Sequence, residues 1–164
     1  MKRTVVFLCT GLGLAALCVP VATSLSIRLV YNPSDSVPRG WYSVGPADAL
    51  HADSIVLARL PAEVAALAAQ RAYLPAGIPL LKRIGAVAPQ RVCVDGMAVR
   101  IDGVQIAVAR SADGLGRPLP IWQQCRSLSD GELFLLSATN PASFDSRYFG
   151  PIAAAAVIGS AQPL

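Results

Sequence analysis

An uncharged apolar run near the N-terminus constrains this chain more than any other feature. Residues 4–27 contain no charged side chain, and about 20 apolar residues suffice for a helix to span a bilayer. Lys2 and Arg3 precede the run, and positive flanking residues favour the cytoplasmic side of a membrane. The sequence therefore predicts an N-terminal membrane anchor or signal-like segment over residues 1–28, and an exported domain over residues 29–164.

Two other interpretations of this run stay open. Small residues in VPVATS, at residues 19–24, are compatible with cleavage of a secretory signal, although the run exceeds the usual apolar length of about 7–15 residues. The other alternative is a buried helix of a soluble core. A retained anchor accounts best for the length of the run, and the rest of the chain is exported whether the segment is retained or cleaved.

The charged residues outside this run are few and dispersed. They make up 15% of the chain, against about 25% in typical soluble domains, and the net charge is +4. Nucleic-acid-binding domains usually gather Lys and Arg on one face or in one segment, and this sequence has no such basic run. We therefore expect no nucleic acid among its partners.

The four cysteines fall into two pairs. Cys9 and Cys18 lie within the apolar run, where we expect them to be small buried apolar side chains. Cys93 and Cys125 lie in the exported domain, where disulfides persist, and their spacing fits neither a C-x-x-C redox pair nor a zinc site. We expect a structural disulfide between Cys93 and Cys125, with two unpaired buried thiols as the alternative.

Beyond residue 28 the pattern predicts one mainly β, mostly antiparallel domain. Two Asp-Gly pairs divide residues 91–108 into three short strands, because Asp-Gly favours tight hairpin turns. Residues 61–71 predict the one short soluble helix, with Pro61 at its first position. Short β-branched or aromatic runs bounded by Gly, Pro and Asp are typical of strands. They predict further strands within residues 39–45, 54–60, 78–89 and 131–137 and near the C-terminus, and a loop over residues 110–124.

Several kinds of chemistry can be set aside. The chain lacks the H-E-x-x-H, phosphate-loop and G-x-S-x-G patterns. His51 is its one histidine, which excludes a multi-histidine metal site. Because His51 lies in a polar segment, we expect it to be an exposed loop residue. We predict no bound metal and no cofactor.

Lys82 is the charged residue in the least expected place. In a strand over residues 78–89, Leu80, Lys82 and Ile84 lie on the same face, and that face is otherwise apolar. Burial lowers the pKa of a lysine amine, and a neutral amine can act as general base toward a serine hydroxyl. The alternative is that Arg83 faces inward, that the Lys82 side chain extends to solvent, and that neither has a chemical role.

Three short elements follow the apolar run in an order that resembles the membrane-bound serine–lysine signal peptidases. They are S-D-S-V-P at residues 34–38, K-R-I-G at residues 82–85 and D-S-R-Y-F-G at residues 145–150. Type I signal peptidases carry Ser-x-Ser-Met-x-Pro-like, Lys-Arg-[apolar]-x-Gly and Asp-Ser-Arg-x-x-Gly elements. The resemblance extends over nearly the whole chain and implies a signal-peptidase-like, antiparallel β catalytic domain behind an N-terminal transmembrane helix.

The first element is more similar to the TraF-type subgroup, the small peptidases of plasmid conjugation systems. Val37 stands where signal peptidases usually have Met. The segment SATNPASFDSR at residues 137–147 replaces their Gly-Asp-Asn-Arg run, which favours the TraF-type subgroup over an enzyme for general precursors. The TraF-type pattern Asn-x-Ser-x-Ser-x-Pro-x-Gly-x-Tyr matches Asn32, Ser34, Ser36, Pro38, Gly40 and Tyr42.

The resemblance implies roles for individual residues. Ser36 would be the nucleophile and Lys82 its general base. The backbone N–H of Ser36 and the hydroxyl of Ser34 would stabilise the oxyanion. Asp145 matches a third functional position, in either a catalytic or a structural role, and would orient Lys82 or pair with Arg147.

The resemblance also implies a location and a substrate. We expect a single-pass protein of the bacterial inner membrane, with a periplasmic serine endopeptidase domain that processes a conjugative pilin precursor or another signal-peptide-bearing substrate within the conjugative transfer machinery. Water would resolve the acyl-enzyme by hydrolysis, whereas the pilin's own amine would give a head-to-tail cyclic product.

The sequence leaves three alternatives to this function. A general type I signal peptidase would process diverse exported proteins. A non-catalytic anchored assembly protein of the conjugation channel would need neither Ser36 nor Lys82. A cytosolic, self-cleaving serine–lysine protein of the LexA kind is disfavoured by the apolar N-terminus.

Overall fold

The structure is a computed structural model that describes residues 3–10, 12–13 and 27–164. Residues 3–10 and 12–13 are helical. Among the described residues, no helix is both long and apolar enough to cross a membrane. The predicted transmembrane helix extends into residues 14–26, which lie outside the described residues, as does Cys18. Cys9 was expected to be buried. It is exposed, because no other part of the described chain packs against it.

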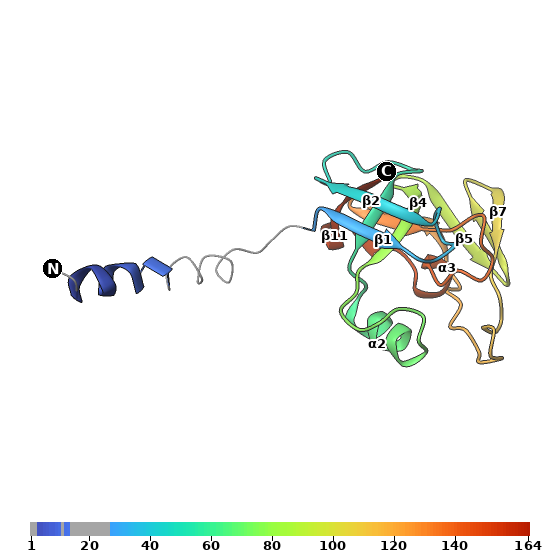
Figure 1. Ribbon diagram of the computed structural model, residues 1–164. Helices are drawn as coiled ribbons and strands as arrows, with labels where there is room; N and C mark the ends of the chain where they lie inside the picture. The colour runs from blue at the N-terminus through green and yellow to red at the C-terminus, as the bar shows by residue number, and fades with distance from the viewer. Residues whose placement is uncertain (1–2, 11, 14–26) are drawn as a thin grey trace.

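Beyond residue 27 the chain forms two antiparallel sheets (Figure 1), which confirms the predicted mainly β, antiparallel domain. The larger sheet has the order β1-β2-β11-β3-β4-β9-β10 and the smaller one β7-β6-β5-β8. The strands are β1 Leu29–Asn32, β2 Gly40–Gly45, β3 Ile55–Ala58, β4 Leu80–Val87, β5 Arg91–Asp95, β6 Ala98–Ile101, β7 Val104–Val108, β8 Cys125–Ser127, β9 Glu132–Leu135, β10 Ile152–Ala153 and β11 Val157–Pro163.

The helical segments of this domain are short. They are α2 Ala62–Gln70, α3 Ser146–Phe149 and the 3-10 helix η1 Ala154–Ala156. The predicted helix is α2, and Pro61 caps it instead of occupying its first helical position. The single turn α3 was not expected, because four residues carry too little periodicity to be recognised. Asp145 caps α3 by accepting a hydrogen bond from the Arg147 backbone N–H.

The predicted three-strand meander over residues 91–108 is present as β5, β6 and β7. Asp102 and Gly103 form one of its turns with φ values of 50° and 83°, the left-handed backbone that Asp-Gly tolerates. The other turn uses Gly96 and Met97, so that Asp95 remains in β5.

The predicted disulfide is also confirmed. Cys93 on β5 lies directly opposite Cys125 on β8, and the two form a disulfide. The strand β8 was not predicted, because three residues within a polar stretch give no alternating signal. Through this disulfide and β8, the long loop over residues 110–124 is fastened to the smaller sheet.

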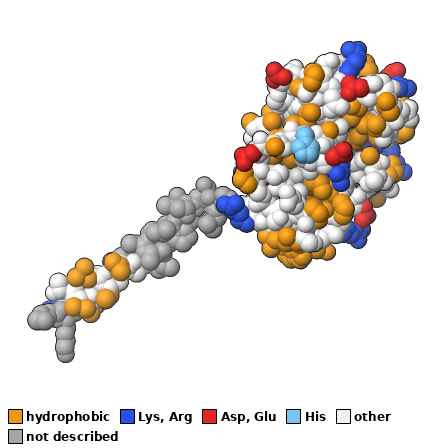
Figure 2. Space-filling model, turned by 90° about the horizontal axis from the view of Figure 1, so that it is seen from above, with side chains coloured by type: hydrophobic (Ala, Val, Ile, Leu, Met, Phe, Trp, Pro, Cys, Tyr) orange, Lys and Arg blue, Asp and Glu red, His pale blue; other side chains and the backbone are white. Residues whose placement is uncertain are grey.

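Apolar side chains from both sheets form the core between them. Val92, Val94 and Val99 of the smaller sheet pack with Ala86 of β4 and Phe134 of β9. This packing makes β4 a central, two-sided strand. His51 lies outside the core and is exposed, as expected. On the face of the molecule shown in Figure 2, basic side chains are interspersed with acidic ones.

The pairing of β4 with β9 depends on Gly85. The register shifts between Ile84 and Ala86, so Gly85 lies at an irregularity in the sheet. A Cβ atom on Gly85 would be 2.8 Å from the Leu136 Cβ and 3.3 Å from the Phe134 carbonyl oxygen. Gly85, the glycine of the K-R-I-G element, lies three residues after Lys82. Its missing side chain lets β4 approach the chain that follows β9.

We predict that Gly85→Ala lowers the free energy of unfolding by about 1–3 kcal/mol, because the added methyl group overpacks this contact. Urea denaturation followed by circular dichroism measures the change. Gly114→Ala is the matched control, since nothing lies within 4 Å of a Cβ added there. Equal destabilisation by the two substitutions would contradict the packing argument.

Candidate active site

The turn between β1 and β2 presents Ser36 and is organised by Asn32, the last residue of β1. Asn32 is only 5% exposed. Its side-chain amide donates to the backbone carbonyls of Ser34 at 2.9 Å, Val37 at 2.9 Å and Pro38 at 3.0 Å. These contacts close the turn around Ser36, which explains why the motif begins with an asparagine.

The far side of the same turn is packed against the core. Val37 is buried together with Tyr42 and Leu81, so an apolar side chain is needed at position 37. The Tyr42 hydroxyl donates to the Pro38 carbonyl at 2.7 Å. Pro38 fixes its own φ and keeps the preceding residue extended, which adds to the rigidity of the turn.

Ser34 is engaged within the turn. Its hydroxyl donates to the Asn32 Oδ1 at 2.8 Å, and its backbone N–H donates to the same oxygen at 3.1 Å. In this geometry the Ser34 hydrogen points at Asn32 and is not free for an oxyanion. A role for Ser34 in binding an oxyanion requires its hydroxyl to rotate away from Asn32.

Lys82 points inward from β4, and its side chain is buried among apolar residues. It is 1% exposed, whereas the side chain of Arg83 is 40% exposed on the other face of the strand. The alternative in which Arg83 faces inward is therefore wrong.

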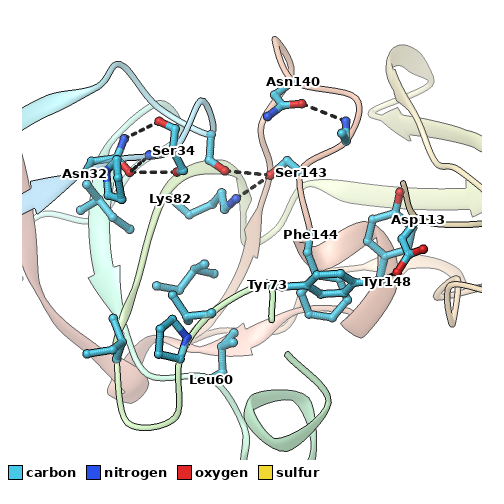
Figure 3. A pocket seen from close by; sticks show the side chains of 18 of the residues that line it. Asn32, Ser34, Leu60, Tyr73, Lys82, Asp113, Asn140, Ser143, Phe144 and Tyr148 are labelled. Atoms are coloured by element: carbon cyan, nitrogen blue, oxygen red, sulfur yellow. Dashed lines mark hydrogen bonds between the residues drawn. The ribbon is translucent and has the colours of Figure 1, made fainter. Parts of the chain in front are cut away.

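Ser143 connects Lys82 to Ser36. The Lys82 Nζ donates to the Ser143 Oγ at 2.5 Å, and the Ser143 Oγ lies 3.2 Å from the Ser36 Oγ. Figure 3 shows Lys82 and Ser143 pointing toward one another, with Ser34 and Asn32 beside them. The structure thus brings the two predicted residues together across a third hydroxyl. An amine and two hydroxyls in series can transfer a proton when the amine is neutral.

The surroundings of Lys82 favour its neutral form. Burial lowers the pKa of the Lys82 amine to about 8, with the Asp145 carboxylate opposing the shift and the Arg147 guanidinium adding to it. At pH 7, one unit below this pKa, about a tenth of the amine is unprotonated. A buried lysine with this pKa can act as a base near neutral pH.

Asp145 and Arg147 form a buried ion pair beside this group. Asp145 is 0% exposed. Its two carboxylate oxygens accept from the Arg147 Nε and Nη2, each at 2.8 Å, and its Oδ2 also accepts from the Ser137 backbone N–H at 3.0 Å. Among the hydrogen bonds of the described residues, none joins Asp145 to Lys82. Of the two contacts expected for Asp145, the structure has the pairing with Arg147.

This ion pair supports the segment that carries Ser143. The Arg147 Nη2 donates to the carbonyls of Asn140 and Ser143, both at 3.1 Å, and its Nη1 donates to the Val108 carbonyl at 3.0 Å. Breaking the pair would leave an uncompensated buried charge, which is strongly destabilising. Asp145 therefore positions Ser143 through Arg147.

Sequence reasoning missed Ser143. The segment over residues 137–147 contains the serines 137, 143 and 146, all of them buried. Ser146 accepts from the Leu135 backbone N–H, and Ser137 accepts from the Asn140 backbone N–H, so these two have local roles. In the sequence, this segment departs from the signal-peptidase pattern, which marks the segment as unusual. That departure does not distinguish Ser143 from the other two serines.

A cleft of about 550 Å³ opens over Ser36, Lys82 and Ser143. Its walls are mostly apolar and come from β1, the start of β4 and the loop over residues 110–119. At its far end Tyr73, Phe144 and Tyr148 form an aromatic cluster (Figure 3). Because β1 is an edge strand, its outer backbone groups face this cleft and can pair with an extended peptide.

We predict that Lys82→Met raises the free energy of unfolding by about 3 kcal/mol at pH 7, since one pKa unit corresponds to about 1.4 kcal/mol and the pKa of Lys82 is lowered by about 2.5 units. The pKa of Lys82 is about 8 in the folded protein, against 10.5 for an ordinary lysine in water. Below pH 8 the wild type carries the full cost of a buried charge. Between pH 8 and about 10.5 the unfolded state binds more protons, so wild-type stability rises with pH.

Urea denaturation of both proteins at pH 7 and pH 9.5 tests this prediction. The advantage of the variant should shrink at the higher pH. A stability difference that is the same at both pH values would contradict the assignment of the low pKa to Lys82.

This chain is similar to three known proteins. A signal peptidase I of Enterococcus faecalis V583, known from its crystal structure, is 20% identical and covers 69% of this chain and 97% of its own, with a TM-score of 0.41. A probable conjugal transfer protein TraF of Sinorhizobium fredii (strain NBRC 101917 / NGR234) is 33% identical over 167 residues, covering 92% of this chain and 86% of that protein. A plasmid transfer protein TraF of Escherichia coli is 31% identical over 149 residues, covering 85% and 83%.

The family comparison covers the whole chain. Residues 1–164 match the family model described as signal peptidase, peptidase S26. Because this match spans every residue and relatives above 30% identity cover most of the chain, the protein belongs to the signal peptidase family, peptidase S26.

Proposed function

We propose that this protein is a membrane-anchored serine endopeptidase in which Ser36 is the nucleophile and Lys82 the general base. The observation that carries the proposal is the series Lys82–Ser143–Ser36, in which a buried amine with a pKa of about 8 is joined to a serine hydroxyl through one intervening oxygen. Membership of the signal peptidase family, a family of serine peptidases, supports the same chemistry.

The first step is acylation. Neutral Lys82 takes the proton of the Ser143 hydroxyl while Ser143 takes the proton of the Ser36 hydroxyl, and the Ser36 Oγ attacks the scissile carbonyl carbon. The tetrahedral intermediate collapses as the C–N bond breaks, and protonated Lys82 gives its proton to the departing amine. The products are an acyl-enzyme on Ser36 and a peptide with a new N-terminus.

The oxyanion of the intermediate needs hydrogen-bond donors. The Ser36 backbone N–H is one, and the Ser34 hydroxyl becomes a second once it rotates away from the Asn32 Oδ1. A single donor of this kind contributes about 3–4 kcal/mol to lowering the barrier. Asn32 keeps the turn in shape during this rotation through its amide contacts with three carbonyls.

The substrate we propose is a conjugative pilin precursor or a related exported protein. The names of the TraF relatives refer to conjugal and plasmid transfer, and the cleft suits an extended, apolar segment next to the β1 edge. The domain begins at β1, directly after the predicted anchor over residues 1–28, so Ser36 would lie near the outer face of the inner membrane. The Cys93–Cys125 disulfide supports a periplasmic location, because disulfides persist in that compartment.

The acyl-enzyme then has two outcomes. Water gives a linear product, whereas the substrate's own N-terminal amine gives a head-to-tail cyclic product. Mass spectrometry of the mature pilin separates them, since the cyclic form is lighter by one water. We propose cyclisation as one outcome of the same acyl-enzyme, and a linear mass would exclude it.

We predict that Ser36→Ala and Lys82→Ala each abolish processing of the proposed conjugative pilin precursor, because one removes the nucleophile and the other its base. Processing is followed by immunoblot in membranes that contain each variant at wild-type level. Ser127→Ala is the matched control, since Ser127 is exposed on β8. Unchanged processing in either active-site variant would favour a non-catalytic assembly protein, and processing of diverse exported proteins would favour a general signal peptidase.

The pH dependence of the reaction follows from the same pKa. Because neutral Lys82 is the active form and its pKa is about 8, kcat/KM should rise about tenfold between pH 7 and pH 9 and then level off. Initial rates on a precursor peptide in detergent micelles measure this. A flat profile, or a midpoint near pH 6.5 as expected of a histidine base, would contradict the role of Lys82.

A further inference from the structure

A second cavity lies against the nucleophile. It has a volume of about 310 Å³ and is lined by the turn over residues 35–39, by Arg83 and by residues 137–139. Among the described residues, Ser36 is the one that lines both this cavity and the larger cleft. A peptide whose scissile carbonyl reaches the Ser36 Oγ must continue in two directions, and two cavities meet at this residue.

The two cavities differ in polar character. The larger cleft is mostly apolar, and its charged side chains are Lys82, which is buried, Arg110, and Asp113, which accepts a hydrogen bond from Arg117. The smaller cavity is lined by two guanidinium groups, Arg39 and Arg83, and one carboxylate, Asp35. Its polar wall therefore carries a net positive charge.

Both arginines keep donors for a ligand. Asp35 accepts from the Arg39 Nε at 2.7 Å and Nη2 at 2.9 Å, which leaves the Arg39 Nη1 without a hydrogen bond to any described residue. The Arg83 Nη1 donates to the Asp53 carbonyl at 2.8 Å. The Asp53 carboxylate is 4.0 Å away and 85% exposed, so it neutralises Arg83 only weakly.

We propose that this smaller cavity, named here the leaving-side pocket, receives the peptide that departs after acylation. Arg39 and Arg83 then select a carboxylate within the first residues of that departing peptide. The inference rests on the proposed peptidase function and adds the chemical class of substrate on one side of the scissile bond. The carboxylate is an acidic side chain or the C-terminus of a short leaving peptide. Planar guanidinium groups with free donors match either source.

The larger cleft is the counterpart for the segment that stays on Ser36. It is lined by the edge strand β1 and by the start of β4, and an edge strand suits an extended segment several residues long. The leaving-side pocket has room for only a few residues. A short leaving segment with a carboxylate fits the smaller cavity with its two guanidinium groups, and a longer, apolar retained segment fits the larger, mostly apolar cleft.

The test uses the full chain in detergent micelles and peptides that span the processing site of the pilin precursor. The peptides share one sequence before the scissile bond. After it they carry Glu, Gln or Lys at the first, second or third position, each with a free or amidated C-terminus. We expect kcat/KM for Glu to exceed that for Gln about fivefold at one of these positions, as for an exposed ion pair, and Lys to be disfavoured.

Two variants and a control locate the effect. Arg83→Gln and Arg39→Gln should each bring the Glu-to-Gln ratio of kcat/KM toward one. Arg110→Gln removes the same charge from the wall of the larger cleft and should leave the ratio unchanged. Raising the salt from about 0.1 M to about 1 M should also reduce the ratio in the wild type, because the Debye length falls from about 10 Å to about 3 Å.

The outcomes separate this inference from the proposed function. Ser36-dependent cleavage with equal kcat/KM for all leaving-side residues and both C-termini would overturn the leaving-side pocket and leave the peptidase intact. A preference abolished by Arg110→Gln but not by Arg83→Gln would place the charge selection in the larger cleft, which also overturns it. No Ser36-dependent cleavage of any peptide would overturn the proposed function and this inference together.

Discussion

The burial of one amine determines much of the rest of this structure. Lys82 is enclosed on a central strand with its Nζ directed at the Ser143 hydroxyl, and desolvation lowers its pKa to about 8. A charge in this position opposes folding. The surrounding sheet must therefore be stable enough to hold the amine away from water, and the same desolvation is what makes the amine a useful base near neutral pH.

Two rigid loops, distant in the sequence, meet at this amine. Asn32 fixes the turn that presents Ser36, and the Asp145–Arg147 ion pair fixes the segment that presents Ser143. Each loop satisfies its own buried polar groups before it contributes a hydroxyl to the site. This arrangement places the Ser36 and Ser143 hydroxyls on supports formed by the chain itself, and in the proposed mechanism the Ser34 hydroxyl rotates away from Asn32.

The two sheets also determine which groups lie on either side of Ser36. Gly85 allows β4 to lie against the chain after β9, and the Cys93–Cys125 disulfide fastens the loop that forms a wall of the larger cleft. Lys82 and Arg83 are neighbours on β4 but face opposite ways, one toward the buried hydroxyls and the other toward the smaller cavity. A single strand thus contributes a buried amine to one side of Ser36 and a guanidinium group to the other.

The sequence by itself determined the elements whose signals are local. The meander over residues 91–108 and the three ordered motifs follow from patterns of a few residues. The Cys93–Cys125 disulfide was inferred from the expected compartment and the spacing of the cysteines, and the sequence left open whether Lys82 or Arg83 faces inward. Only the tertiary structure decided that Ser143 joins Lys82 to Ser36, because the contact between the two serines spans 107 residues of sequence and no local pattern separates Ser143 from the nearby serines. The sequence likewise did not predict the hydrogen bond between Ser34 and Asn32 or the strand β8. The partner of a hydroxyl group and a strand of three residues are both determined by the packing around them.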